Sequence, residues 1–212
     1  AVALLGLTKC LPDSLAVLLS MILSLIITGG FHEDGLADCA DAFGGGWDKE
    51  NVLRIMKDSR LGSYGVLSMT MALMVKFSAL QFLLGLSVWP ALFALLVAHS
   101  LSRASALWIM ARLDYVRDTD TSKAKPIAQE MNRTDLLIGS MCGLLPSVIL
   151  VCINPLLWPV LTASFIWSVL AFWGAGRYFF GRLGGYTGDC LGAAQQISEL
   201  GIYCLFCAFM IL

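Results

Sequence analysis

The stretch at residues 64–87, YGVLSMTMALMVKFSALQFLLGLS, decides the fold, because Lys76 is its only charged side chain. As an α-helix with a rise of 1.5 Å per residue, it is about 36 Å long and can cross the roughly 30 Å hydrocarbon layer of a bilayer. A helix also satisfies its own backbone hydrogen bonds, as a lipid environment requires. The stretch therefore predicts a transmembrane helix.

Similar apolar stretches recur along the chain. Further spans are predicted at 14–30, 89–111, 135–153, 156–180 and 190–212. The sequence is 58% hydrophobic and 14% charged, whereas a soluble domain carries about a quarter charged residues. We therefore expect an all-α fold, a single integral-membrane domain over residues 1–212, arranged as a polytopic bundle of about six transmembrane helices in a lipid bilayer. Residues 1–12 resemble the end of a preceding helix, so we expect one more span upstream.

The links between spans indicate the orientation. The links at 28–63, 112–134 and 181–189 are polar and charged, whereas those at 86–90 and 154–159 are short and uncharged. Most lysines and arginines fall in or beside the polar links, so the positive-inside rule places that face in the cytoplasm. The net charge of −1 gives no reason to expect nucleic-acid binding. The seven cysteines are scattered through apolar stretches, which indicates core packing rather than a disulfide framework. The sequence does not decide whether the protein forms a homo-oligomer.

An acidic run, EDGLADCAD at 33–41, follows the first predicted span. If this run is helical, Asp34, Asp38 and Asp41 lie within about 60° of one another on one face. Like charges at this spacing repel, so the face favours a compensating cation, and carboxylate oxygens suit Mg²⁺ or Mn²⁺. Glu33 points about 100° away from Asp34 and is either an auxiliary base or an exposed residue. The alternative for the whole run is a solvated helix end.

A second motif, KDSRLG at 57–62, precedes the span at 64–87. Asp58 is a candidate to complete the metal shell. Arg60 has the planar donor fork that suits phosphate oxygens, and Lys57 can act as a point charge. An interfacial salt-bridge cluster is the equally good alternative.

Two other polar links contain candidate substrate contacts. Lys125 is the preferred contact for an anionic substrate in the link at 118–126, although an anchor to anionic lipid explains such a lysine equally well. The glycine-rich turn at 184–189 opens the last span, where free backbone N–H groups can hold phosphate. Its candidate substrate-binding residues are Gly185, Thr187, Gly188 and Asp189. Asp189 is alternatively an N-cap.

Several polar residues fall inside or beside predicted spans. Arg103 lies within the span at 89–111, where a charge is costly unless it is paired or hydrated. It lines a substrate cavity, snorkels to the surface, or forms a structural ion pair. Lys76 and Glu199 raise the same question. His32, beside the acidic run, is a candidate substrate or acid–base residue, with local hydrogen bonding as the alternative.

Three motifs together resemble the cobalamin synthase family, whose members are also called adenosylcobinamide-GDP ribazoletransferases or cobalamin 5′-phosphate synthases. They are TGGFHEDGLADCAD at 28–41, KDSRLG at 57–62 and GGYTGDCLGAA at 184–194. The resemblance covers nearly the whole chain in order. Family members carry a further segment upstream, with an aromatic and Arg-Pro motif.

The resemblance implies a transferase of cobalamin biosynthesis in the cytoplasmic (inner) membrane of a prokaryote. The positive-inside topology predicts that its active site faces the cytoplasm, because the candidate residues lie in the polar links. It implies attack by α-ribazole or its 5′-phosphate on adenosylcobinamide-GDP, with release of GMP and with Mg²⁺ as the expected ion. Asp34, Asp38 and Asp41 would then hold the metal, and Arg60 and Lys125 would clamp phosphate oxygens. One carboxylate, Asp41 or Glu33, would activate the nucleophile.

Two other functions remain as alternatives. A CDP-alcohol phosphotransferase shares the metal chemistry but takes a lipid substrate and releases CMP. A cation transporter would use Arg103, Lys76 and Glu199 as an ion path. The transporter is disfavoured because the carboxylates gather near one face and the sequence has no internal repeat.

Overall fold

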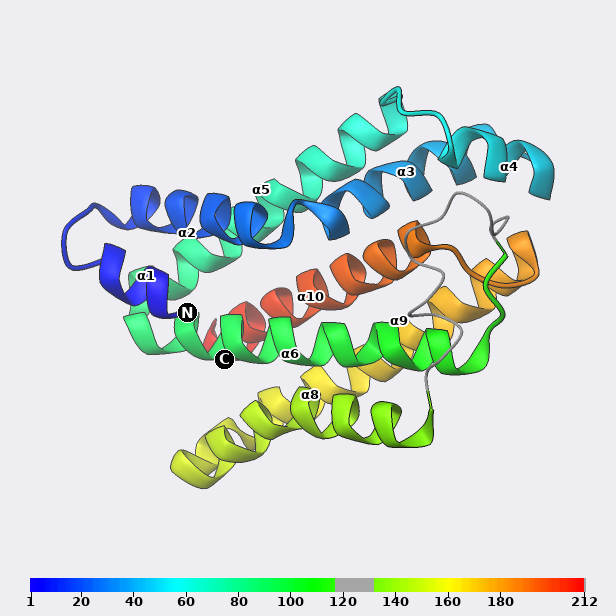
Figure 1. Ribbon diagram of the computed structural model, residues 1–212. Helices are drawn as coiled ribbons and strands as arrows, with labels where there is room; N and C mark the ends of the chain where they lie inside the picture. The colour runs from blue at the N-terminus through cyan, green and yellow to red at the C-terminus, as the bar shows by residue number, and fades with distance from the viewer. Residues whose placement is uncertain (117–131, 212) are drawn as a thin grey trace.

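The computed structural model describes residues 1–116 and 132–211 and confirms an all-α bundle (Figure 1). The helices are α1 (Val2–Leu7), α2 (Asp13–Thr28), α3 (Phe31–Gly45), α4 (Lys49–Met56), α5 (Ser63–Leu86), α6 (Val88–Arg112), α8 (Arg133–Ile153), the 3₁₀ turn η1 (Pro155–Leu157), α9 (Trp158–Leu183) and α10 (Gly188–Ile211).

Five helical segments are long and apolar enough to cross a membrane, and a bent pair adds a sixth. The five are α5, α6, α8, α9 together with its η1 turn, and α10. Each matches a predicted stretch to within a few residues. The expectation of about six spans in a polytopic bundle is therefore confirmed.

The helix predicted at 14–30 is present as α2, but it counts as a membrane span only together with α3, from which a sharp bend separates it. The helix α2 ends at Thr28, and α3 begins at Phe31 with its axis turned by 85°. Gly29 and Gly30 lie between them, both with φ of 67°, a conformation that glycine adopts without the strain a Cβ atom would bring. The acidic run therefore occupies a separate helix and does not continue straight from a membrane span.

The centre of the bundle is formed by α6 and α10. In α6 the most apolar stretch is 56% buried, whereas in α8 only 11% is buried, so α8 is peripheral and presents its apolar face to lipid. The helix α10 packs against α3, α5, α6 and α9. One core cluster includes Leu80, Leu101 and Phe206, and a second surrounds Val52 and Tyr186.

The described parts of the polar links lie at one end of the bundle, as predicted. Figure 1 shows α4, the start of α5, the ends of α6 and α9 and the start of α10 at that end. The chain after α6 is tied to the turn before α10, because Val116 N–H donates to the Tyr186 carbonyl and Tyr186 N–H donates to the Asp114 carbonyl, both at 3.0 Å. We call this end of the bundle, with α4 and the starts of α5 and α10, the polar end.

Candidate functional site

The acidic run is helical, as the metal-site prediction requires. Asp34, Asp38 and Asp41 all lie on α3, where their spacing places them on one face. Asp34 is exposed, Asp38 and Asp41 are half-buried, and Glu33 is buried. The face therefore opens outward at Asp34, while Glu33 points into the bundle.

Asp41 fixes the start of α5 against α3. Its carboxylate accepts the N–H groups of Gly62 at 2.7 Å and Gly65 at 2.8 Å. These groups belong to the first turn of α5, where N–H groups lack partners within the helix. A Cβ atom at either glycine would collide with the Asp41 carboxylate. This structural role of Asp41 was not predicted from the sequence, although the glycines of the KDSRLGSYG stretch are a signal for a close approach.

The carboxylates of α3 suit a metal ion that takes its remaining ligands from water and from the substrate. In residues 1–116 and 132–211, no three His, Cys, Asp or Glu side chains gather closely enough to hold a metal ion. Mg²⁺ in phosphotransfer enzymes often uses one or two carboxylates and completes its shell with water and substrate phosphate. Asp34 and Asp38 suit that mode. The three-carboxylate ligand set stays a prediction.

The glycine-rich turn lies directly beside the acidic helix. A Cβ atom at Gly35 would lie 2.8 Å from the carbonyl oxygen of Asp189, and one at Gly192 would lie 3.1 Å from the carbonyl oxygen of His32. Only glycine permits this approach without displacing the backbone. The structure thus brings the backbone of the acidic helix at Gly35 against the backbone of Asp189, which is far away in the sequence.

Within the turn, several predicted substrate residues also have structural roles. Thr187 is fully buried and its Oγ1 accepts the N–H of Cys190 at 3.4 Å, the geometry of an N-cap. The alternative that Asp189 caps α10 is therefore wrong, since Asp189 lies in the first turn. Gly185 and Gly188 are buried, and a Cβ atom at Gly185 would collide with the Asp114 carbonyl. Phosphate binding by this turn stays a prediction.

The motif at 57–62 forms a local ion pair. Arg60 Nη2 lies 2.6 Å from Asp58 Oδ2, with the Arg60 side chain 88% exposed. Side-chain hydrogen bonds from Arg60, followed by its backbone N–H, lower the pKa of Asp58 to about 2. The salt-bridge alternative is thus confirmed for this pair, and Lys57 is exposed. The metal role of Asp58 and the phosphate roles of Arg60 and Lys57 stay predictions. Lys125 lies outside the described residues.

A network of buried charges joins α3, α5 and α10 inside the bundle. Lys76 Nζ lies 2.9 Å from Glu199 Oε1 and 3.4 Å from Glu33 Oε1. Gln196 donates to Glu33 at 3.1 Å, and Gln195 donates to Glu199 at 2.6 Å. Such partners offset the cost of removing charges from water. The sequence indicates Lys76 and Glu199 as separate charges within predicted spans. It does not predict that they pair with each other and with Glu33.

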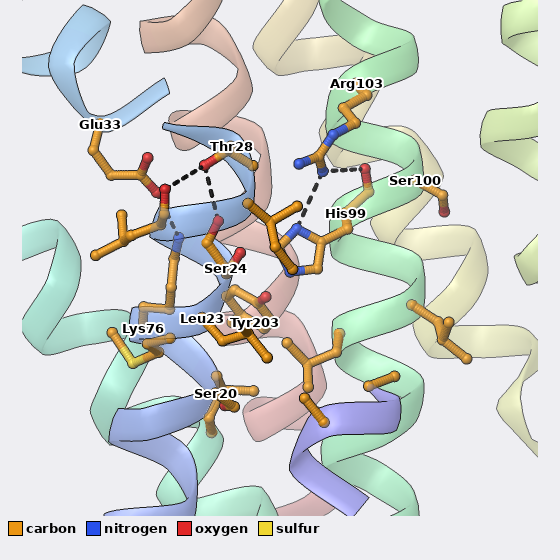
Figure 2. Close-up of a pocket in the computed structure, with 18 of the residues that line it drawn as sticks. Ser20, Leu23, Ser24, Thr28, Glu33, Lys76, His99, Ser100, Arg103 and Tyr203 are labelled. Atoms are coloured by element: carbon orange, nitrogen blue, oxygen red, sulfur yellow. Dashed lines mark hydrogen bonds and ion pairs between the residues drawn. The ribbon is translucent and has the colours of Figure 1, made fainter. Parts of the chain in front are cut away.

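Arg103 extends this network into a cavity of about 460 Å³ between α2, α5, α6 and α10. Figure 2 shows Glu33, Lys76, His99 and Arg103 around this cavity. Arg103 Nη1 lies 3.1 Å from His99 Nδ1 and donates to the His99 carbonyl at 2.9 Å, and His99 lies 3.7 Å from Glu199. The prediction that Arg103 lines a cavity is confirmed. Substrate binding there stays a prediction.

One oxygen of Glu33 lacks a partner. Oε2 of Glu33 is buried and accepts no hydrogen bond within the described part of the chain, while Oε1 takes Lys76 and Gln196. His32 is half-buried and stands edge-on to the Phe31 ring at 5.9 Å. The structure therefore separates these neighbours, with Glu33 in the cavity wall and His32 against α10.

Comparison with known proteins shows similarity along almost the whole chain. A family model described as "Cobalamin-5-phosphate synthase" matches residues 1–207. A protein of Shewanella frigidimarina is 49% identical over 203 residues, covering 93% of this chain and 74% of that protein. A protein of Leptospira interrogans is 43% identical over 194 residues, covering 91% and 73%. Both relatives are named adenosylcobinamide-GDP ribazoletransferase. No solved structure matches the chain.

Proposed function

The chain belongs to the cobalamin-5-phosphate synthase family, and from that premise we propose that this transferase joins adenosylcobinamide-GDP to α-ribazole or its 5′-phosphate and releases GMP. The observation that best supports the proposal is the contact between the acidic helix and the glycine-rich turn, where Gly35 meets the backbone of Asp189. Carboxylates for a divalent ion thereby adjoin a helix start, which favours an anionic group. Both features suit a diphosphate substrate.

Each part of the chain has a distinct task in this proposal. Asp34 and Asp38 would hold Mg²⁺ or Mn²⁺, and the ion would supply positive charge to offset the negative charge on the departing GMP. Asp41 keeps the acidic face in register with α5 through its bonds to Gly62 and Gly65. Arg60 and Lys57 are exposed at the polar end, from which they contact phosphate oxygens of the incoming substrate.

The location follows from the same arrangement. We place the polar end in the cytoplasm of a prokaryotic cell, with the bundle in the inner membrane, because the basic residues concentrate in the polar links. Both substrates are hydrophilic, so a site at the membrane surface gives them access from the aqueous side.

The activity is tested with purified protein in detergent or nanodiscs, given adenosylcobinamide-GDP and α-ribazole with Mg²⁺. We expect GMP release coupled to formation of the joined corrinoid. A parallel reaction with a CDP-alcohol and a lipid acceptor tests the phospholipid alternative. CMP release from that pair, without GMP release from the first, would contradict the proposal. Cation flux into liposomes without corrinoid would favour the transporter.

A further inference from the structure

A second groove, of about 490 Å³, lies between α6 and α9 near the polar end. Arg112 from α6 and Arg177 from α9 flank it, and Phe172 and Trp173 form part of its wall. No residue of this groove belongs to the proposed transfer site. The arrangement of its side chains therefore needs a separate explanation.

The two arginines carry charge that the described chain leaves uncompensated. Both are exposed, and each guanidinium rests over an aromatic ring, Arg112 over Phe172 at 5.6 Å and Arg177 over Trp173 at 5.2 Å. Neither forms an ion pair with a carboxylate in residues 1–116 or 132–211. Stacking orients the guanidinium planes but leaves their N–H donors available. The pair is thus poised to bind an anion.

The floor of the groove is open because two glycines form it. A Cβ atom at Gly176 or Gly181 would meet no atom within 4 Å. Close packing therefore does not require glycine at these positions in this chain. The missing side chains leave an apolar channel along α9, next to Phe172 and Trp173.

The groove lies at the level of the membrane surface. Arg112 is the last residue of α6, and Arg177 lies six residues before the end of α9 at Leu183, which is about 9 Å along the helix. Trp173 is 56% exposed, and exposed tryptophan prefers the interface between lipid and water. The arginines therefore lie at the level of lipid headgroups, with the apolar channel beside them.

We propose that this groove binds an anionic glycerophospholipid. The phosphodiester lies between Arg112 and Arg177, near Gly181, and one acyl chain lies along Gly176 toward Phe172 and Trp173, which are deeper in the membrane. Basic pockets between membrane helices on the cytoplasmic side suit such headgroups. A zwitterionic lipid is disfavoured, because the groove offers its cationic group no carboxylate among the described lining residues. The proposal does not depend on the transferase activity.

The charge requirement is tested by native mass spectrometry of the purified protein in mixed micelles, with phosphatidylglycerol competing against phosphatidylcholine. We expect the wild type to retain phosphatidylglycerol preferentially. Arg112→Gln/Arg177→Gln should lose about thirtyfold of that preference. The matched control Lys49→Gln/Arg133→Gln removes the same charge from exposed positions outside the groove and should retain the preference. Equal losses in both variants would overturn the proposal in favour of general surface charge.

The apolar channel is tested by filling it. Gly176→Leu should abolish selective retention of the lipid, because the leucine occupies the acyl-chain position without meeting other atoms at its Cβ. Gly174→Leu is the control, since Gly174 is equally open but does not line this groove. Retention by Gly176→Leu, or a change in its monomer–dimer equilibrium instead of its lipid binding, would overturn the proposal. Circular dichroism measures the helical content of each variant and so verifies its folding. If the arginine double variant unfolds, the comparison of Gly176→Leu with Gly174→Leu decides the proposal.

Discussion

At the scale of single residues, the aspartates of α3 divide into different roles. Asp34 is exposed, whereas Asp41 binds two backbone N–H groups of α5. Sequence spacing was sufficient to place Asp34, Asp38 and Asp41 on one helical face. It could not show which of them also holds another helix, because the partners of Asp41 come from the tertiary arrangement.

These roles predict opposite effects of substitution. Asp34→Asn should lower kcat by about 100-fold, since a metal ligand contributes several kcal/mol to the transition state, and should leave thermal stability unchanged. Asp41→Ala should lower the free energy of unfolding by about 2 kcal/mol through loss of two charge-assisted hydrogen bonds. GMP release and thermal unfolding in detergent measure the two quantities. Full activity of Asp34→Asn across a Mg²⁺ titration would refute the metal role.

The glycines around Asp41 provide a second prediction at this scale. Gly65→Ala should destabilise the protein by about 1–3 kcal/mol, because its Cβ collides with the Asp41 carboxylate and the helices must separate. Gly85→Ala, in the same helix, has open space around its Cβ and is the matched control. Equal unfolding temperatures for the two variants would contradict the contact.

The ion pair at Asp58 gives a pH-dependent prediction. Arg60 lowers the pKa of Asp58 to about 2, compared with about 3.9 in an unfolded chain. The stabilisation from this pair is therefore present above about pH 4 and is lost as the pH falls through about 2. Arg60→Gln should raise the pKa of Asp58 toward its ordinary value, as measured by NMR titration of ¹³C-labelled aspartate. An unchanged pKa would exclude Arg60 as the cause.

At the scale of elements, apolar length predicted the long helices well. The stretch at 64–87 corresponds to α5 at Ser63–Leu86, because a run of apolar residues long enough to cross a bilayer has few alternatives in lipid. Two elements were missed. The helix α4 spans only eight residues and is too short and too polar to be found by apolar length. The bend at Gly29 and Gly30 depends on φ angles that composition does not reveal.

The bend itself can be tested by substitution. Gly29→Ala/Gly30→Ala should destabilise the protein by about 1–2 kcal/mol per residue, because a Cβ atom is strained at φ of 67° although space is available. Gly174→Ala, in the interior of α9 with open space, should be neutral or slightly stabilising. Thermal unfolding compares them. A double variant as stable as the wild type would show that the helices join differently.

At the scale of the whole molecule, the buried charges hold the bundle together across distant segments. Glu33 and Lys76 are 43 residues apart, and Lys76 and Gln196 are 120 residues apart. Local patterns carry no information about pairs at such separations. This is why the sequence predicted the acidic face but not the network behind it.

The network predicts non-additive effects of substitution. Lys76→Met should destabilise the protein by about 3–5 kcal/mol, because Glu33 and Glu199 are left buried without their shared cation. Adding Glu33→Gln and Glu199→Gln to Lys76→Met should recover part of that loss by removing the unpaired charges. Unfolding of each variant in detergent gives the coupling energy. Additive losses would mean that the three side chains do not interact.

The position of Lys76 also has a consequence for synthesis. Lys76 lies in α5, whereas Glu199 and Gln196 lie in the last helix. At a translation rate of about 5–20 residues per second, the 120 residues that separate Lys76 from Gln196 take on the order of ten seconds to make. During this interval Glu33 is the only carboxylate partner of Lys76 in the network that has already been synthesised. The shorter of the two ion pairs of Lys76 thus forms only after α10 has been made, and until then Glu33 alone neutralises this lysine inside the membrane.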